Sequence, residues 1–250
     1  MNPSLFPPFE SLNPIPQNTD YIELLRELSI NTINPLNKHI QIKTITDLRR
    51  VRKYQIDFFK VCFDNIIERF INNYIHSKSN EEISLCALLF FDEMFNDDPW
   101  NFNERWIDVC YSTLMDLIQS STNVNISNAA KNAVKNLYVN MHHTSKITNT
   151  FRCFRNKYNE YNDELLKYIE QNFHIMLSEI DVTNLIYMFD WNYIVEYIKD
   201  YLSDNNAYFY YKRCFDALKV KVADRWDNEF MLKVILQEDN RNIINKICNS

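Results

Sequence analysis

The sequence of 250 residues contains no glycine. Glycine usually supplies tight turns, β-bulges and phosphate-binding loops, because it reaches backbone conformations that other residues avoid. Its absence argues against P-loop, dinucleotide-binding and nucleophile-elbow motifs and against most β-hairpins. A helical protein can do without glycine, since asparagine can take the left-handed position after a helix, and the chain has 33 asparagines. The composition is therefore compatible with an all-α fold.

Apolar residues recur at helical spacing along most of the chain. The pattern predicts helices separated by short polar turns, which is typical of antiparallel helix pairs. The predicted helical segments are residues 21–30, a basic segment opening at Thr44 to Asp47, then 56–75, 81–95, 104–118, 125–141, 147–158, 163–177, 182–189 and 191–202 as one bent helix or two, 207–222 and 227–247. Residues 31–43 are expected to form a loop.

The first 19 residues differ from the rest of the chain. Residues 1–19 hold five of the seven prolines, and Phe6 and Phe9 lie between them. Proline disrupts helix and sheet hydrogen bonding, so we predict an extended N-terminal arm. The arm is either a disordered tail or a segment whose Leu5, Phe6 and Phe9 pack on a neighbouring surface. Residues 20–250 are predicted to form a single helical repeat domain.

Charge and cysteine usage limit the environment and the partners. The net charge of −6 argues against a dedicated nucleic-acid binder. The six cysteines are scattered without a CxxC pair, so we interpret them as reduced structural thiols of a cytoplasmic protein that needs no metal or cofactor. The N-terminus does not resemble a signal peptide, and no apolar run is long enough to span a membrane, so we expect no membrane partner.

A small residue recurs in the second helix of successive predicted helix pairs. Cys86, Ala130 and Cys214 are 44 and 84 residues apart, and the larger interval equals two steps of 42. The skipped step predicts a matching helix near Asn172. A period of roughly 40 to 47 residues with one helix pair per period is typical of HEAT and armadillo arrays. The sequence therefore predicts an α-solenoid of about five antiparallel helix pairs.

Two runs carry a family resemblance, EISLCALLFFDEMFNDD and IDVCYSTLMDLIQSSTNVNISNAAKNAVKNLYVNM. Residues 54–143 resemble two consecutive HEAT repeats, and the runs are similar to the TOG-like arrays of microtubule-associated and ciliary proteins. The resemblance implies a protein-binding solenoid in the cytoplasm, at the cytoskeleton or in the cilium, with tubulin or axonemal proteins as partners. In that family the turns within the repeats contact tubulin through aromatic and basic residues. Here those turns contain one basic residue, Lys78, and no aromatic residue, which favours a scaffold docked in a larger assembly.

The strongest candidate binding residues are a basic helix face and a tryptophan. Arg49, Arg50, Arg52 and Lys53 lie close together on one predicted helix. They either dock an acidic partner, such as a tubulin tail, or form a solvated face paired with neighbouring acids. Trp100 lies in the turn DDPWNFNERW, where a tryptophan either anchors an interface or covers an apolar seam.

The sequence thus predicts a non-enzymatic scaffold that binds other proteins. The alternative is a helical enzyme or small-ligand-binding protein with an aromatic-lined pocket, because the chain has 17 phenylalanines and 15 tyrosines. His174 lies on a largely apolar helix, and we interpret it as a buried core histidine.

Overall fold

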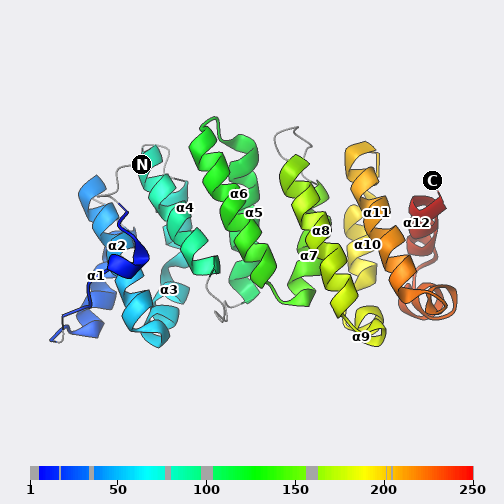
Figure 1. Cartoon of the computed structure of the whole chain (residues 1–250), viewed down its shortest axis with the longest axis horizontal. Helices are drawn as coiled ribbons and strands as arrows, with labels where there is room; N and C mark the ends of the chain where they lie inside the picture. Colours follow the sequence, from blue (N-terminus) through cyan, green and yellow to red (C-terminus); the bar gives the residue numbers. More distant parts are fainter. Residues whose placement is uncertain are drawn as a thin grey trace. The chain divides into compact units, whose positions relative to one another are not determined.

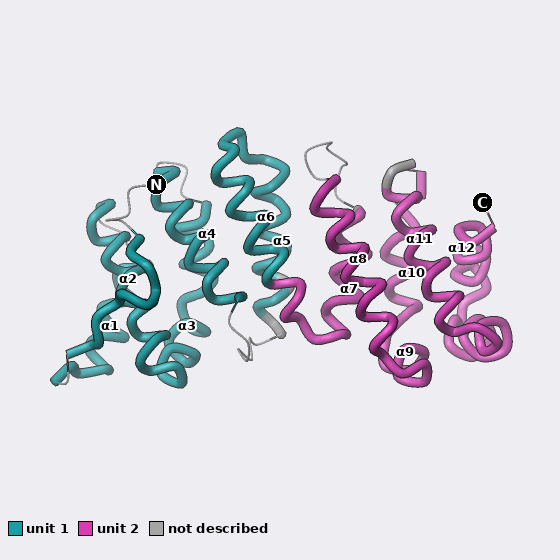
Figure 2. The backbone as a smooth tube through the Cα atoms, in the orientation of Figure 1, with its two compact units in different colours: residues 1–136 teal, residues 137–250 magenta. Residues whose placement is uncertain are grey.

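The computed structural model describes residues 6–16, 18–33, 37–76, 80–96, 104–155, 163–200, 202–203 and 205–249. Every regular element in these ranges is helical, which confirms the all-α prediction (Figure 1). The chain divides into two compact units, Met1–Asn136 and Leu137–Ser250 (Figure 2). Each unit is described by itself below.

The first unit is a set of helices in which α2 is central. Helix α2 packs on α1, α3 and α4, and α1 also packs on α3. The helices are α1 (Tyr21–Ile33), α2 (Lys38–Tyr54), α3 (Ile56–Phe70) with a π-helical continuation (Ile71–Ile75), α4 (Glu81–Asn96), α5 (Glu104–Ser120) and α6 (Val124–Asn140), whose last residues belong to the second unit.

The loop expected at residues 31–43 is mostly helical, so that prediction is wrong. Helix α1 runs on to Ile33, and α2 begins at Lys38. The Asn37 side chain caps α2 by accepting a hydrogen bond from the Ile40 N–H at 3.0 Å. An asparagine in this position satisfies one of the open donors of the first helical turn and so fixes where the helix begins.

Contacting aromatic rings form the core of the first unit. Phe63 contacts Phe70 at 5.7 Å between ring centroids, and Phe70 contacts Phe91 at 5.8 Å. Phe59 and Phe90 add an edge-to-face pair at 6.1 Å, and all five rings are buried. Edge-to-face and offset pairs are the favoured aromatic geometries. The wide apolar stripe of residues 56–75 is therefore covered by α4, as its width indicated.

The second unit contains two contacting rows of helices. Helices α7, α10 and α12 contact one another in succession, α8 contacts α11, and α11 also contacts α7 and α12. The helices are α7 (His143–Arg155), α8 (Asp163–Glu179), α9 (Val182–Tyr187), α10 (Trp191–Lys199), α11 (Asn205–Val222), a π-helical segment (Trp226–Val234) and α12 (Glu238–Asn249). The core of this unit is built around Phe151, whose ring meets those of Phe173, Trp191 and Phe215 at 5.9, 6.4 and 5.3 Å.

The small residues that suggested a period lie inside helices. Cys86, Ala130 and Cys214 are buried in α4, α6 and α11. Helix α8 covers the skipped step, where Asn172 is half-buried and donates a hydrogen bond to the Tyr168 carbonyl at 2.9 Å.

Many long-range side-chain hydrogen bonds span a similar interval in both units. In the first unit, pairs 41, 42 and 44 residues apart are Asn73 with Thr32, Asn123 with Glu81, and Lys38 with Glu82. In the second unit, pairs 42, 42 and 43 residues apart are Asn192 with Val234, Arg225 with Thr183, and Lys221 with Ser178.

Two local expectations are corrected by the structure. The segment 227–247 is not one helix, because it is interrupted between Val234 and Glu238. Among the described residues, no asparagine takes the left-handed position that the sequence left open to it after a helix, and Ala223 after α11 is the one residue there with positive φ, at 52°.

All six cysteines are free thiols, and five of them are buried. Burial raises the pKa of the Cys62 thiol to about 12 and that of Cys86 to about 11. No described helix is long and apolar enough to cross a membrane. No cluster of three or more histidine, cysteine and acidic side chains that could hold a metal occurs in the described part of the chain.

Candidate functional site

The predicted basic face of α2 lies against the N-terminal arm. The Arg49 side chain is fully buried, and its Nε and Nη2 atoms pair with the Glu93 carboxylate of α4 at 2.8 and 2.5 Å. The same Nη2 donates to the Pro7 carbonyl at 2.7 Å, and the guanidinium lies 3.7 Å from the centroid of the Phe6 ring. In Figure 1 the dark blue arm crosses α2. Arg49 is therefore an internal contact, not a surface charge.

The next turn of α2 holds the second half of the arm. Lys53 Nζ donates to the carbonyls of Phe9, Glu10 and Leu12 at 3.1, 2.7 and 3.2 Å. The Tyr54 hydroxyl donates to the Leu12 carbonyl at 2.6 Å. Two of these carbonyls belong to the single 3-10 turn Phe9–Ser11 and the third to the residue after it, so three partial negative charges surround the ammonium group.

Arg52 completes this surface. Its side chain is buried, its Nη2 donates to the Glu93 carbonyl at 2.9 Å, and its guanidinium lies 4.9 Å from the Phe9 ring. We call the side chains of Arg49, Arg52, Lys53 and Tyr54 the arm clamp. The basic face and the proline-rich arm, which were separate candidates in the sequence, are thus partners of each other.

The remaining predicted residues are divided between surface and undescribed segments. Arg50 is 37% exposed and pairs with Asp47 at 3.2 Å, as the solvated-face interpretation expected. Lys78 and Trp100 lie outside the described residues. The three described tryptophans, Trp106, Trp191 and Trp226, are all buried, which agrees with a tryptophan that covers an apolar seam.

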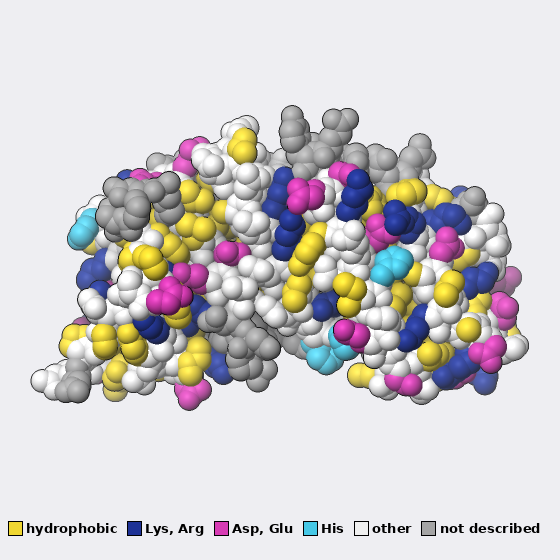
Figure 3. Space-filling model, in the orientation of Figure 1, with side chains coloured by type: hydrophobic (Ala, Val, Ile, Leu, Met, Phe, Trp, Pro, Cys, Tyr) yellow, Lys and Arg dark blue, Asp and Glu magenta, His cyan; other side chains and the backbone are white. Residues whose placement is uncertain are grey.

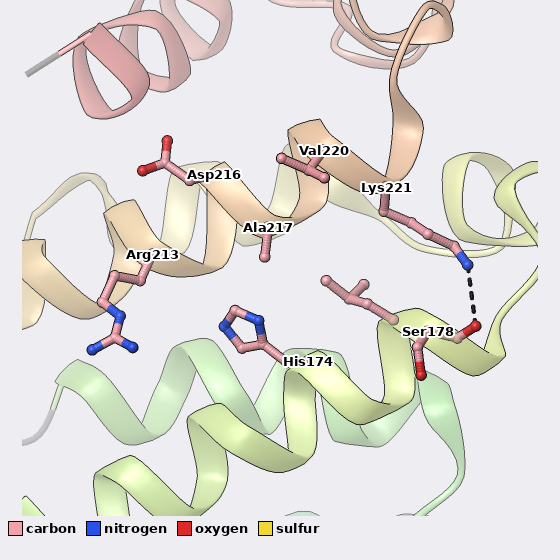
Figure 4. Close-up of a pocket in the computed structure, with 8 residues that line it drawn as sticks. His174, Ser178, Arg213, Asp216, Ala217, Val220 and Lys221 are labelled. Carbon is pink, nitrogen blue, oxygen red and sulfur yellow. Dashed lines mark hydrogen bonds between the residues drawn. The ribbon is translucent and has the colours of Figure 1, made fainter.

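The second candidate site is a shallow groove of about 460 Å³ between α8 and α11 in the second unit (Figure 4). We call it the α8/α11 groove. Its lining residues are His174, Leu177, Ser178, Arg213, Asp216, Ala217, Val220 and Lys221. Figure 3 shows basic and acidic side chains and a histidine over these two helices. None of the eight lining residues is aromatic, so this groove does not match the aromatic-lined pocket of the alternative prediction.

A buried carboxylate organises one end of the α8/α11 groove. Glu170 is only 3% exposed and pairs with Arg213 Nε at 2.6 Å, and His174 Nε2 lies 3.7 Å from the same carboxylate oxygen. Figure 4 shows the Arg213 and His174 side chains next to each other in the space between α8 and α11. An acid buried in α8 thus holds an arginine of α11 in place while half of the arginine side chain stays exposed.

The other end of the groove combines a lysine with an exposed apolar residue. Lys221 Nζ donates to the Ser178 carbonyl at 3.3 Å, and Val220 beside it is 80% exposed. Asp216 supplies a negative charge, which Lys212 pairs at 3.4 Å. The groove therefore combines two basic side chains, Lys221 and the half-exposed Arg213 that Glu170 pairs, with solvent-exposed apolar surface, a combination that suits an acidic polypeptide with an apolar side chain.

Sequence reasoning missed this groove because it assigned His174 to the core. The His174 side chain is 44% exposed. The buried stripe of α8 runs through Phe173, Met176 and Leu177, and His174 lies beside that stripe. Helical periodicity alone would have placed His174 at the boundary of the apolar face.

A scan against protein-family models found no match, and a search of the curated proteins found no similar sequence.

Proposed function

We propose that this chain is a non-enzymatic scaffold that binds another protein, built as a HEAT-type array of antiparallel helix pairs. The observation that carries the proposal is the recurrence of long-range hydrogen bonds between residues 41 to 44 apart in each unit. In a helical array each repeat contacts mainly the next one, so equivalent positions meet at one constant interval. The interval agrees with the spacing of Cys86, Ala130 and Cys214 in the sequence.

The starts of one series of helices support the same arrangement. Helices α2, α4, α6, α8 and α11 begin at Lys38, Glu81, Val124, Asp163 and Asn205. Their spacing stays near the interval that the hydrogen bonds span. A helix pair that cannot bury its apolar face alone is stable when stacked in this way, and the stack presents an extended surface for a partner.

The α8/α11 groove is the binding surface in this proposal, and its partner is an acidic polypeptide segment. Lys221 and Arg213, which stays half exposed although Glu170 pairs it, are basic side chains at the two ends of the groove in a chain whose net charge is −6. Charge complementarity of this kind increases the rate of association and selects the partner. The exposed Val220 supplies an apolar contact between the charges.

A matched pair of charge reversals tests the proposal. Lys221 lines the groove, whereas Lys219 is exposed on the same helix and does not. Wild-type, Lys221→Glu and Lys219→Glu chains are used as baits for cross-linking and affinity purification from the source cell. We expect one protein to be captured by the wild type and by Lys219→Glu, and to be reduced at least about tenfold by Lys221→Glu. Equal capture by both variants would exclude the groove as the binding surface. Absence of any saturable partner would exclude the scaffold function.

Within this class, a microtubule or ciliary assembly remains the narrower proposal that the sequence resemblance supports. The microtubule proposal cannot use Arg49 and Arg52 as contacts to tubulin, because both side chains bind the arm and Glu93. Co-sedimentation of the purified wild-type chain with microtubules tests it. Absence from the pellet would remove tubulin as the partner and would leave the broader proposal to the capture experiment.

A further inference from the structure

The contacts of the arm clamp have the character of a peptide-binding site that is already filled. Arg49, Lys53 and Tyr54 all donate hydrogen bonds to the arm, and every acceptor is a backbone carbonyl. Because all peptides carry the same carbonyls, these contacts fix the path of the segment without specifying its side chains. Selectivity must come from the two aromatic rings, which lie against guanidinium groups of the clamp.

The occupant has the conformation of a proline-rich ligand. Pro8 has φ −52° and ψ 142°, close to polyproline II geometry, and a single turn at Phe9–Ser11 follows it. Prolines carry no N–H, so Pro7 and Pro8 present carbonyls and no competing donors. A segment that is already extended loses little entropy on binding, which is why proline-rich segments are common ligands.

The arm is attached to the helices chiefly by side chains. The backbone-to-backbone hydrogen bonds of the described arm stay within the arm itself, from Ser11 to Pro8, from Leu12 to Phe9 and from Thr19 to Pro16. All of the clamp's donors belong to side chains of α2. An outside segment with the same carbonyls and rings can therefore make the same contacts without any change in the helices.

We propose that the arm clamp is a binding site for aryl-Pro-Pro-aryl segments that end in a single turn, and that Phe6 to Leu12 are its intramolecular occupant. A partner protein that carries such a segment binds by displacing the arm. Tethering gives the arm a high effective concentration at the clamp, so the intrinsic affinity is measured best when the arm is weakened. The proposal does not depend on the α8/α11 groove.

The first experiment weakens the arm and supplies its sequence from outside. The Phe6→Ala/Phe9→Ala chain is titrated against a fluorescent peptide of residues 6–16, FPPFESLNPIP, with anisotropy as the readout. We expect saturable 1:1 binding to this variant and at least about tenfold weaker binding to the wild type, in which the arm competes. A peptide with both phenylalanines replaced by alanine is expected not to bind. Absence of saturable binding to a folded variant overturns the proposal.

A second pair of variants localises the binding. Lys53→Met in the Phe6→Ala/Phe9→Ala background removes the cation that holds three carbonyls, and Lys60→Met removes a lysine of α3 outside the clamp. We expect about tenfold weaker peptide binding with Lys53→Met, because losing a hydrogen bond from a charged donor weakens an affinity by about a factor of ten. We expect no change in peptide binding with Lys60→Met. Equal binding to both would place the peptide elsewhere and overturn the proposal.

An exchange experiment leaves the clamp and the arm anchors unaltered, and it decides the question if the double alanine chain does not fold. A protease site is placed at residues 17–18, the folded chain is cut, and the labelled peptide is added in excess. We expect the labelled peptide to replace the cut arm in a 1:1 complex, and unlabelled peptide to chase it off. A cut arm that stays in place, or that leaves without replacement, refutes the proposal.

Discussion

Glu93→Ala is expected to destabilise the first unit far more than Glu82→Ala, although both remove an acid of α4 that pairs with a base of α2. In each pair the two residues are 44 positions apart in the sequence. The pairs differ in burial. The side chains of Arg49 and Glu93 are 0% and 21% exposed, whereas those of Lys38 and Glu82 are 46% and 36% exposed.

The expected magnitudes follow from that difference. Removing one partner of a buried ion pair costs about 3–5 kcal/mol, because the remaining charge is left without compensation. Glu93 is partly exposed, so water can reach the vacated space, and we expect a loss of about 2–3 kcal/mol for Glu93→Ala. An exposed pair is worth about 0–1 kcal/mol, which is the loss expected for Glu82→Ala.

Urea unfolding followed by circular dichroism measures both values. Raising the salt concentration should reduce the effect of Glu82→Ala and leave that of Glu93→Ala nearly unchanged, because salt screens exposed charges more than buried ones. Equal losses of stability in the two variants, within about 0.5 kcal/mol, would refute the assignment of Arg49 and Glu93 as a buried ion pair, because that is the usual scatter of surface substitutions. Arg49 would then be solvated in solution, and the buried geometry of the arm clamp would be wrong.

Two further predictions concern the second unit. Arg225 and Tyr187 bind the Glu229 carboxylate and lower its pKa from 4.5 to about 2. The wild type should therefore be more stable than Glu229→Gln by a constant amount above about pH 4.5, and this difference should disappear as the pH falls toward 2. Urea unfolding midpoints of both chains at several pH values measure the difference. Ala223→Gly should stabilise the chain by up to about 1 kcal/mol, because it relieves a left-handed alanine and is partly offset by the freedom of glycine in the unfolded chain, as thermal unfolding can show.

Helix positions were predictable from the sequence because the apolar stripes are strong. The stripe of residues 56–75 has the same limits as α3 with its π-helical continuation, and the segment 125–141 differs from α6 by one residue at each end. The buried positions Cys86 and Cys214 were also identified from their spacing. These features depend on local periodicity, which one sequence contains.

The partners of charged residues were not predictable in the same way. A run of Arg49, Arg50, Arg52 and Lys53 looks like an exposed face, because bases are rarely buried without a partner. The partners are Glu93 and the carbonyls of the arm, which lie more than 40 positions away in either direction. The sequence shows the charges but not which acid or carbonyl will meet them after folding.

The helix ends show most clearly how this chain folds without glycine. A left-handed glycine after a helix lets the local backbone bind the last carbonyls. Here, side chains from helices about 42 residues away bind such carbonyls: Asn73 at Thr32, Tyr74 at Asn31, Lys221 at Ser178, and Asn192 at Val234. Asn192 also accepts a hydrogen bond from the Leu236 N–H at 3.0 Å, which explains why residues 227–247 break without a local signal. These three C-terminal helix ends are therefore tertiary features, so changing one such side chain should loosen two segments at once, its own helix and the distant end that it binds.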